Sequence, residues 1–230
     1  MGPKFSIISI AKKESDFSRL KEALSNQCYR DFEFVPSTKG TIPEAWNDGI
    51  SKAKGEFFIF MDSDAYPLND HWLEEISNTI EKNVVMKGIE IRPTDMTMNN
   101  LIGDANIFRN EKFNESYQIC EDMEFSARMK KKGNKIKRIN SFPVVHTPSV
   151  SLRKTFRRSI LNGFYSMKII AIYGYSNTET INSQDFGGTR INPLINRFRL
   201  ISENILFLMG LVIGAILYLP VLIRNYFSKK

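Results

Sequence analysis

The chain has 230 residues, of which 42% are hydrophobic and 25% are charged, and its net charge is +7. This length is enough for one domain with a real core plus an appendage, and the composition is that of an ordinary globular protein. The two cysteines, Cys28 and Cys120, lack the spacing of metal ligands. This excludes a cysteine-rich metal framework, and free thiols in a reducing compartment are expected.

The positive charge is concentrated in one part of the chain. The segment 125–178 contains no Asp or Glu and holds twelve Lys and Arg residues. Such a block indicates an anionic partner, such as a membrane surface, a phosphorylated lipid or a nucleic acid, although a solvated surface that aids solubility is the simpler alternative. The apolar C-terminal segment argues against a nucleic-acid protein, so we expect no nucleic-acid partner.

The first part of the chain alternates between predicted strands and predicted helices. Apolar runs predict strands at 4–10, 31–35, 56–62 and 84–93. Apolar residues at helical spacing, together with capping signals, predict helices at 14–28, 41–55 and 70–82. This order is typical of an α/β domain with a mostly parallel sheet flanked by helices. In such sheets, ligands bind beyond the carboxyl ends of the strands.

The pattern becomes less regular further along the chain. Residues 103–113 are expected to form a strand that enters a turn, and residues 120–133 a helix. The segment 135–149 predicts a strand and a loop that carries His146. Residues 151–175 predict a basic amphipathic helix of the kind that lies on an anionic membrane.

The C-terminal segment 205–223 has 19 residues without a charge. At about 1.5 Å per residue, a helix of this length reaches about 28 Å, close to the thickness of a bilayer core. A buried core helix is the alternative, but apolarity on every face and basic residues at both ends favour a transmembrane helix. Pro220 can kink this helix or let it fold back as a shallow hairpin. The expected division is a globular domain at 1–150, a basic membrane-interface region at 151–200 and a transmembrane helix with its tail at 201–230.

Two carboxylates follow the third predicted strand, in the stretch Asp62-Ser63-Asp64. Carboxylates two residues apart at a strand end can share one divalent cation and the ribose of a nucleotide. Hard oxygen ligands suit Mg²⁺ or Mn²⁺, and these ions bridge phosphate oxygens. Taken alone, such a tripeptide is common, and a solvated turn is its alternative interpretation.

Six motifs follow one another along the chain. They are "KFSIISI" (4–10), "AWNDGISKAKGEFFIFMDSDAYP" (45–67), "HWLEEI" (71–76), "GDANIFRNEKF" (103–113), "CEDMEFSARMKKKG" (120–133) and "VVHTPS" (144–149). In this combination the sequence resembles the family 2 glycosyltransferases over residues 4–150. The resemblance implies the GT-A fold, which has a Rossmann-like, mostly parallel sheet, and makes 1–150 the catalytic domain.

The resemblance also implies roles for five residues. Asp64 would bind the metal, Mn²⁺ or Mg²⁺, and Asp62 the ribose or the metal, so that this pair holds the nucleotide-sugar diphosphate. Asp122 would remove the proton of an acceptor hydroxyl as its oxygen attacks the anomeric carbon with inversion, and Glu121 is the substitute candidate. His146 would complete the metal shell. The alternatives are acids that favour a helix start and a loop histidine without a ligand role.

One stretch departs from the family pattern. Many relatives carry an Asp-rich turn after the second strand that reads the nucleotide base, whereas this chain has Pro36-Ser37-Thr38. The nucleotide is therefore not assigned from the sequence.

These inferences predict an inverting glycosyltransferase of the hexosyltransferase type. Its donor would be a nucleotide sugar, and its acceptor a lipid-linked or membrane-surface molecule such as a polyprenyl phosphate or a lipid-linked saccharide. Because nucleotide sugars are made in the cytosol, we expect a membrane-associated protein with its catalytic domain on the cytoplasmic side. Two alternatives are a non-catalytic nucleotide-sugar-binding membrane subunit and a nucleotidyltransferase. A nucleotidyltransferase would need a Gly-rich, Arg-containing phosphate loop after the first strand, and "SIISIAKKES" contains none.

Overall fold

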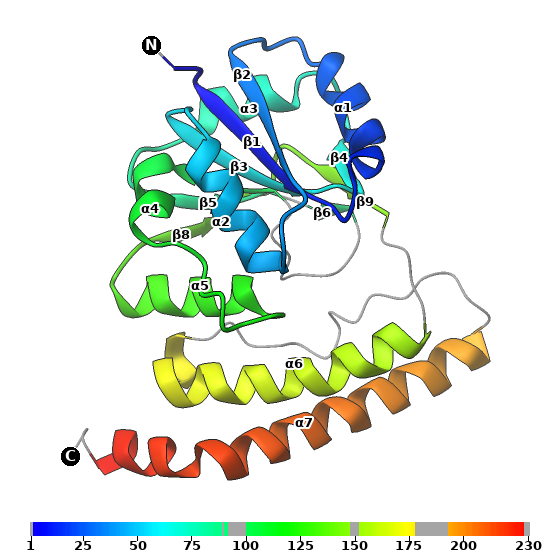
Figure 1. Ribbon diagram of the computed structural model, residues 1–230, viewed down its shortest axis with the longest axis vertical. Helices are drawn as coiled ribbons and strands as arrows, with labels where there is room; N and C mark the ends of the chain where they lie inside the picture. The colour runs from blue at the N-terminus through cyan, green and yellow to red at the C-terminus, as the bar shows by residue number, and fades with distance from the viewer. Residues whose placement is uncertain (1, 89, 92–99, 148–151, 178–192, 228–230) are drawn as a thin grey trace. The chain divides into compact units, whose positions relative to one another are not determined.

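The computed structural model describes residues 2–88, 90–91, 100–147, 152–177 and 193–227 (Figure 1). The chain forms two compact units. The first consists of Met1–Glu115 and Asn134–Pro148, and the second of Ser116–Gly133 and Ser149–Lys230. The division predicted from the sequence, at residues 150 and 200, stays a prediction, because compactness alone assigns no role to a segment.

Among the described residues of the first unit, six strands form one sheet in the order β2-β1-β3-β7-β5-β8. The strands are β1 Phe5–Ile10, β2 Phe32–Ser37, β3 Phe57–Asp62, β5 Val85–Lys87, β7 Leu101–Asp104 and β8 Ile136–Arg138. β1 pairs in parallel with β2 and β3, and β5 with β8, whereas β7 runs antiparallel to both of its neighbours. The predicted α/β fold with a mostly parallel sheet is confirmed.

A second, smaller sheet has the order β4-β9-β6 within the described residues. Its strands are β4 Ala65–Pro67, β6 Glu90–Ile91 and β9 Val144–His146. The single strand predicted at 84–93 is therefore wrong as one element. Its first half, β5, pairs with β7 and β8 in the large sheet, and its second half, β6, pairs with β9 in the small one.

The helices of the first unit follow the predictions closely up to residue 100. They are a 3₁₀ turn η1 Glu14–Phe17, α1 Ser18–Ser25, α2 Ile42–Lys52, α3 Trp72–Thr79 and α4 Ala105–Asn110. α2 begins with a capping box in which the Thr41 backbone N–H donates to Glu44 Oε2 at 2.7 Å. The prediction of a turn after residue 103 is wrong beyond Asp104. The side chain of Asp104 accepts a hydrogen bond from the backbone N–H of Asn106, so it caps a short helix instead.

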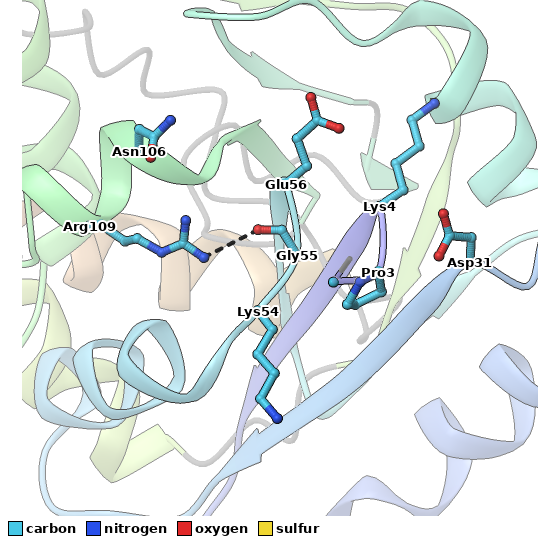
Figure 2. Close-up of a pocket in the computed structure, with 9 residues that line it drawn as sticks. Pro3, Lys4, Asp31, Lys54, Gly55, Glu56, Asn106 and Arg109 are labelled. Carbon is cyan, nitrogen blue, oxygen red and sulfur yellow. Dashed lines mark hydrogen bonds between the residues drawn. The ribbon is translucent and has the colours of Figure 1, made fainter.

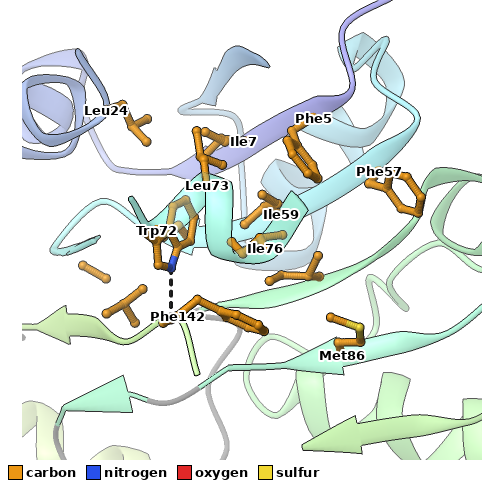
Figure 3. Packing of buried hydrophobic residues seen from close by; sticks show 14 of the residues in the cluster. Phe5, Ile7, Leu24, Phe57, Ile59, Trp72, Leu73, Ile76, Met86 and Phe142 are labelled. Atoms are coloured by element: carbon orange, nitrogen blue, oxygen red, sulfur yellow. Dashed lines mark hydrogen bonds between the residues drawn. The ribbon is translucent and has the colours of Figure 1, made fainter. Parts of the chain in front are cut away.

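The large sheet is covered by helices on both faces because β3 is apolar on both sides. Ile59, at the centre of β3, belongs to the core cluster that contains Trp72 of α3 and Leu24 of α1 (Figure 3). Phe60, which points to the opposite face, packs against Trp46 of α2 and Phe108 of α4, with ring centroids 5.5 and 4.7 Å away. The continuous apolar run of β3 is what a strand buried on both faces requires.

The second unit is helical. It contains α5 Glu121–Lys131, α6 Leu152–Tyr173, a 3₁₀ turn η2 Tyr175–Asn177 and α7 Pro193–Phe227. α6 contacts both α5 and α7, and α6 and α7 run side by side in the same direction (Figure 1). The helices predicted at 120–133 and 151–175 are confirmed. Within α7, the stretch Asn204–Arg224 has a mean hydropathy of 2.6, and it is long and apolar enough to cross a membrane.

Candidate functional site

Three of the predicted site residues come together at the carboxyl end of β3. The ligand atoms of Asp62, Asp64 and His146 all lie within 4.8 Å of one another. The two carboxylates are partly exposed, whereas His146 is 8% exposed. His146 Nε2 lies 3.1 Å from Asp64 Oδ1, so these two groups also form a hydrogen bond. Two carboxylates and an imidazole can hold a divalent cation, so the donor set fits the predicted metal.

The small sheet brings His146 to the aspartates across a large sequence separation. Asp62 is the last residue of β3, and Asp64 lies in the turn that leads to β4. β4 pairs antiparallel with β9 so that Ala65 stands opposite His146. The next residue, Thr147, donates from its backbone N–H and its hydroxyl to the Asp64 carbonyl, at 2.9 and 3.1 Å. The backbone of Asp64 is thus bound directly to the segment that carries His146.

The loop before β9 is anchored in the core through Phe142. Its carbonyl accepts a hydrogen bond from Trp72 Nε1 at 3.0 Å (Figure 3) and another from Asn100 Nδ2 at 2.7 Å. Its N–H donates to Glu75 Oε2 at 3.0 Å. Phe142 has a φ of 43°, which is rare for an aromatic residue. Its ring is fully buried. These contacts hold the backbone in a strained conformation four residues before His146.

The predicted catalytic acids lie in the first turn of α5, in the second unit. Glu121 is 7% exposed, whereas Asp122 is more exposed. Asp122 Oδ1 accepts a hydrogen bond from the N–H of Met123 at 2.8 Å. Acidic side chains are favoured at a helix N-terminus, so capping and catalysis both suit this position.

Cys120 precedes these acids in a left-handed backbone conformation, with a φ of 61°. Such a conformation is uncommon for a residue other than glycine, and it is often found at functional sites. The Cys120 thiol is 7% exposed and donates to Asn162 Oδ1 of α6 at 3.4 Å. Burial, together with the carboxylates of Asp122 and Glu121, raises the pKa of Cys120 well above its usual value. This thiol is therefore held neutral and unreactive.

A buried ion pair follows one turn later on α5. Glu124 is completely buried and binds Arg128 through two hydrogen bonds, Nε to Oε1 at 2.9 Å and Nη2 to Oε2 at 3.3 Å. The hydroxyl of Tyr173, near the end of α6, also donates to Glu124 Oε1. Burial and this hydrogen bond raise the pKa of Tyr173, so the phenol stays neutral. The network ties α5 to α6.

One acidic side chain at the carboxyl edge of the large sheet, that of Asp48, is not predicted from the sequence. In the strand register, Ile10 of β1 stands between Ser37 of β2 and Asp62 of β3, so the two outer residues are about 10 Å apart. Ser37 donates to Asp48 Oδ2 of α2 at 2.8 Å. The only signal in the sequence is that Asp48 and Lys52 are four residues apart on a helix, which predicts an ion pair but not its place beside β2.

A separate pocket of about 560 Å³ lies at the opposite edge of the sheet, where β1 and β3 begin (Figure 2). Two of its charged side chains, Arg109 and Glu56, bind protein atoms. Arg109 donates to the carbonyls of Ala53 and Gly55, at 3.2 and 3.3 Å, and Glu56 pairs with Lys82 at 3.0 Å. Sheets of this kind bind ligands at the carboxyl ends of their strands, so this pocket is not the candidate site.

The sequence profile of glycosyl transferase family 2 matches residues 15–158, which is more than half of the chain. The chain belongs to this family. A sequence comparison with curated proteins gave no match. Family membership confirms the predicted class of enzyme, a glycosyltransferase. The individual roles predicted for the site residues stay predictions.

Solved structures share the fold of this chain. PcManGT, a mannosyltransferase from Pyrobaculum calidifontis in complex with GDP-Man and Mn²⁺, has a TM-score of 0.60 and 13% identity, over 94% of this chain and 74% of that one. TarS from S. aureus has a TM-score of 0.51 and 15% identity, over 74% of this chain but only 42% of TarS. TarS 1–349 in complex with UDP-GlcNAc has a TM-score of 0.50 and 16% identity, over 90% and 81% of the two chains. These likenesses confirm the GT-A fold.

Proposed function

We propose that this protein transfers a sugar, with inversion, from a nucleotide-sugar donor to a lipid-linked or membrane-surface acceptor, and that it needs Mn²⁺ or Mg²⁺. The observation that carries the proposal is the group of Asp62, Asp64 and His146 at the carboxyl end of β3, in a chain of glycosyl transferase family 2. PcManGT was solved with GDP-Man and Mn²⁺, and TarS with UDP-GlcNAc. Nucleotide-sugar donors therefore fit this fold.

The metal group is the part of the site that would hold the donor. Asp62 and Asp64 offer carboxylate oxygens, and His146 offers an imidazole nitrogen. A bound divalent cation would neutralise the charge of the departing nucleoside diphosphate. The carboxylate of Asp62 would also accept a hydrogen bond from a ribose hydroxyl, because it stands at the very end of β3 where the binding edge of the sheet begins.

Asp122 is the proposed catalytic base. It would take the proton of the acceptor hydroxyl while that oxygen forms a bond to the anomeric carbon and the bond from this carbon to the diphosphate breaks. The electron pair of the broken bond leaves with the nucleoside diphosphate, and the proton ends on the Asp122 carboxylate. Asp122 is favoured over Glu121 because a base has to reach an acceptor, and Glu121 is almost completely buried.

A membrane-surface acceptor is supported by the charge and apolarity of the second unit. The segment 125–178 contains no acid, and nine of its twelve Lys and Arg residues belong to this unit, which favours an anionic surface or a phosphorylated headgroup. The apolar stretch Asn204–Arg224 is long and apolar enough to add a hydrophobic contact with lipid. A nucleotide-sugar donor comes from the cytosol, so the catalytic domain would act on the cytoplasmic side.

The test combines transfer and binding measurements on the full chain. A panel of labelled nucleotide sugars, with Mn²⁺ and a membrane extract, is assayed for label that moves into the lipid phase, and donor binding is followed by titration calorimetry. We expect Asp122→Asn to abolish transfer but keep Mn²⁺-dependent donor binding, and Asp64→Asn to lose that binding. Asp70→Asn, at an exposed aspartate outside the site, is the matched control and should change neither.

Three results would overturn parts of the proposal. If no donor gives binding heat with Mn²⁺ or Mg²⁺, the metal group does not hold a nucleotide sugar. If Asp122→Asn transfers sugar at the normal rate, another group is the base. If the normal chain binds a donor but transfers nothing to any lipid and hydrolyses nothing, it is a nucleotide-sugar-binding subunit rather than an enzyme.

A further inference from the structure

One face of α7 is apolar and exposed along the whole of its hydrophobic stretch. This outer face of α7 is defined by Ile205, Leu208, Val212, Ile216, Leu219 and Ile223, whose exposed fractions are between 48% and 68%. These residues recur every three or four positions, so they form one continuous stripe. An exposed apolar surface of this length marks a contact with lipid or with another protein.

The opposite face of α7 is closed by α6. A Cβ at Gly210 would come within 2.0 Å of the Ile160 carbonyl oxygen, and one at Gly163 would come within 2.0 Å of the Phe207 carbonyl oxygen. The two backbones therefore touch, with glycine on both sides of the contact. Small residues allow such close approach between helices that pack in lipid or at its surface. α7 is thus one half of a tightly packed pair, not an isolated helix.

The charge of α6 limits how this pair can meet a bilayer. α6 and α7 run side by side in the same direction, with the Ile160 backbone against Gly210 (Figure 1). If the packed pair crossed a bilayer, α6 would carry Arg157, Arg158 and Lys168 into the hydrocarbon beside the apolar stretch of α7. Charged side chains are costly there.

The far side of α6 leads to the same conclusion. α6 packs on α5 through Ile169, which clusters with Tyr117 and Ala127, and through the bond from Tyr173 to Glu124. α5 ends at two exposed lysines, at positions 131 and 132. A pair that spanned a bilayer would draw this charged helix toward the hydrocarbon. A pair that lies flat keeps α5 in water, with α6 between α5 and the lipid.

We infer that α6 and α7 lie flat in one leaflet of an anionic membrane, with the outer face of α7 among the acyl chains, and that α7 does not cross the bilayer. The inference rests on the membrane association proposed above and specifies its geometry. The positive charge of the second unit indicates that the outer face of α7 contacts lipid rather than another protein. Arg157 and Arg158 of α6 are exposed, and no acid occurs between Glu124 and Glu179 to oppose anionic headgroups. Basic amphipathic helices that expose a long apolar stripe bind membranes in this way.

The experiment measures depth at three points of the outer face. Single cysteines are introduced as Ile205→Cys, Val212→Cys and Ile223→Cys in a Cys28→Ser background, because Cys28 is exposed, whereas Cys120 is buried. Each is labelled with a polarity-sensitive fluorophore, and the full chain is bound to sealed vesicles of phosphatidylcholine and phosphatidylglycerol. Quenching by lipids with spin labels at shallow or deep positions then reports the depth of each site.

A flat pair predicts that all three labels lie at the same shallow depth. A deep label at position 212 between two shallow ends would overturn the inference while leaving membrane association intact. Failure of the chain to float with vesicles would overturn both. A stable dimer that hides the outer face without lipid would identify a second copy as the occupant and refute the lipid contact.

A matched pair of variants tests the role of the α6 contact. Gly210→Leu places a side chain against the Ile160 backbone and should release α7 from α6. We expect the depths of the three labels to diverge in this variant. Ile216→Leu changes the outer face without touching α6, and it should leave the shallow, uniform depths unchanged. If Gly210→Leu also leaves them unchanged, the packing against α6 does not hold α7 flat.

Discussion

Removal of the Glu124 carboxylate should destabilise the second unit more than any comparable change on its surface. Glu124 is completely buried, and its partner Arg128 has a side chain that is 16% exposed. In Glu124→Ala, the guanidinium of Arg128 loses its two hydrogen bonds to Glu124 and keeps its charge in a largely dry position. Tyr173 also loses the acceptor of its hydroxyl.

The magnitude follows from the burial of the pair. Loss of one partner from a buried ion pair costs about 3–5 kcal/mol of unfolding free energy, and the residual exposure of Arg128 places the expected value near the lower end, about 3 kcal/mol. Tyr173→Phe removes one hydrogen bond to a charged acceptor and should cost about 1.5 kcal/mol. The double variant should cost less than the sum, because both changes remove the same bond.

Thermal unfolding of the full chain, followed by the helical circular dichroism signal, measures these differences. For a chain of this size, about 3 kcal/mol lowers the Tm by about 6–12 °C. Glu22→Ala on α1, at an exposed glutamate, is the control and should change the unfolding free energy by less than about 0.5 kcal/mol. If Glu124→Ala moves the Tm no further than this control does, or if the effects of Glu124 and Tyr173 simply add, the network does not join α5 to α6.

Three other changes have outcomes that follow from single contacts. His146→Gln should weaken Mn²⁺ binding by at least about 10-fold in titration calorimetry, because it removes one of three donors, and unchanged affinity would exclude His146 as a ligand. Burial raises the pKa of Asp48, but hydrogen bonds from Lys52 and Ser37 and the charges of nearby lysines outweigh this effect, so the pKa is lowered overall. The ionised carboxylate therefore stabilises the fold above the ordinary carboxyl pKa of about 4, and this stabilisation is lost as the pH falls through the lowered pKa. Asp48→Asn should therefore flatten the acid limb of the unfolding free energy in urea titrations, and an unaltered limb would contradict this. Trp72→Phe should cost about 2 kcal/mol in the same titrations, from a small cavity and the lost bond to the Phe142 carbonyl, and a neutral result would mean that this bond contributes nothing.

The sequence predicted the aspartates of the site better than the histidine. A strand apolar on both faces that ends in Asp62 and Asp64 can be recognised locally, because the apolar run has to stop where the chain leaves the sheet. His146 lies 82 residues after Asp64. Their meeting depends on the pairing of β4 with β9, two strands of three residues each. No periodicity reveals strands this short, and only the family resemblance pointed to His146.

The errors in the fold prediction arise where tertiary contacts override a local pattern. The apolar run at 84–93 has a strand composition throughout, but its two halves pair in different sheets. The short helix α4 was missed because its start depends on Asp104, a strand residue whose side chain also acts as a cap. Asp48 was missed as a neighbour of the binding edge for a related reason, since it reaches Ser37 from a helix rather than from a loop.

The C-terminal helices illustrate what apolarity alone leaves open. The composition of 205–223 predicts a membrane contact, but the same composition suits a helix that crosses a bilayer and one that lies in it. The glycines at 163, 210 and 214 are the signal that distinguishes an isolated helix from a packed one. Their partners are more than forty residues away in the sequence, so the pairing could be read only from the structure.

The anchoring of Phe142 has a consequence for the rate at which a cation is captured. Because the core holds the backbone ahead of His146, the imidazole stands beside Asp64 before any ion arrives. The entropy of ordering that loop is lost during folding and does not oppose binding. Mn²⁺ mixed rapidly with the protein should therefore associate in one phase whose rate rises linearly with ion concentration, without a slower isomerisation behind it. The heat capacity change of the same reaction should be small, because the described residues that would hold the ion already lie together.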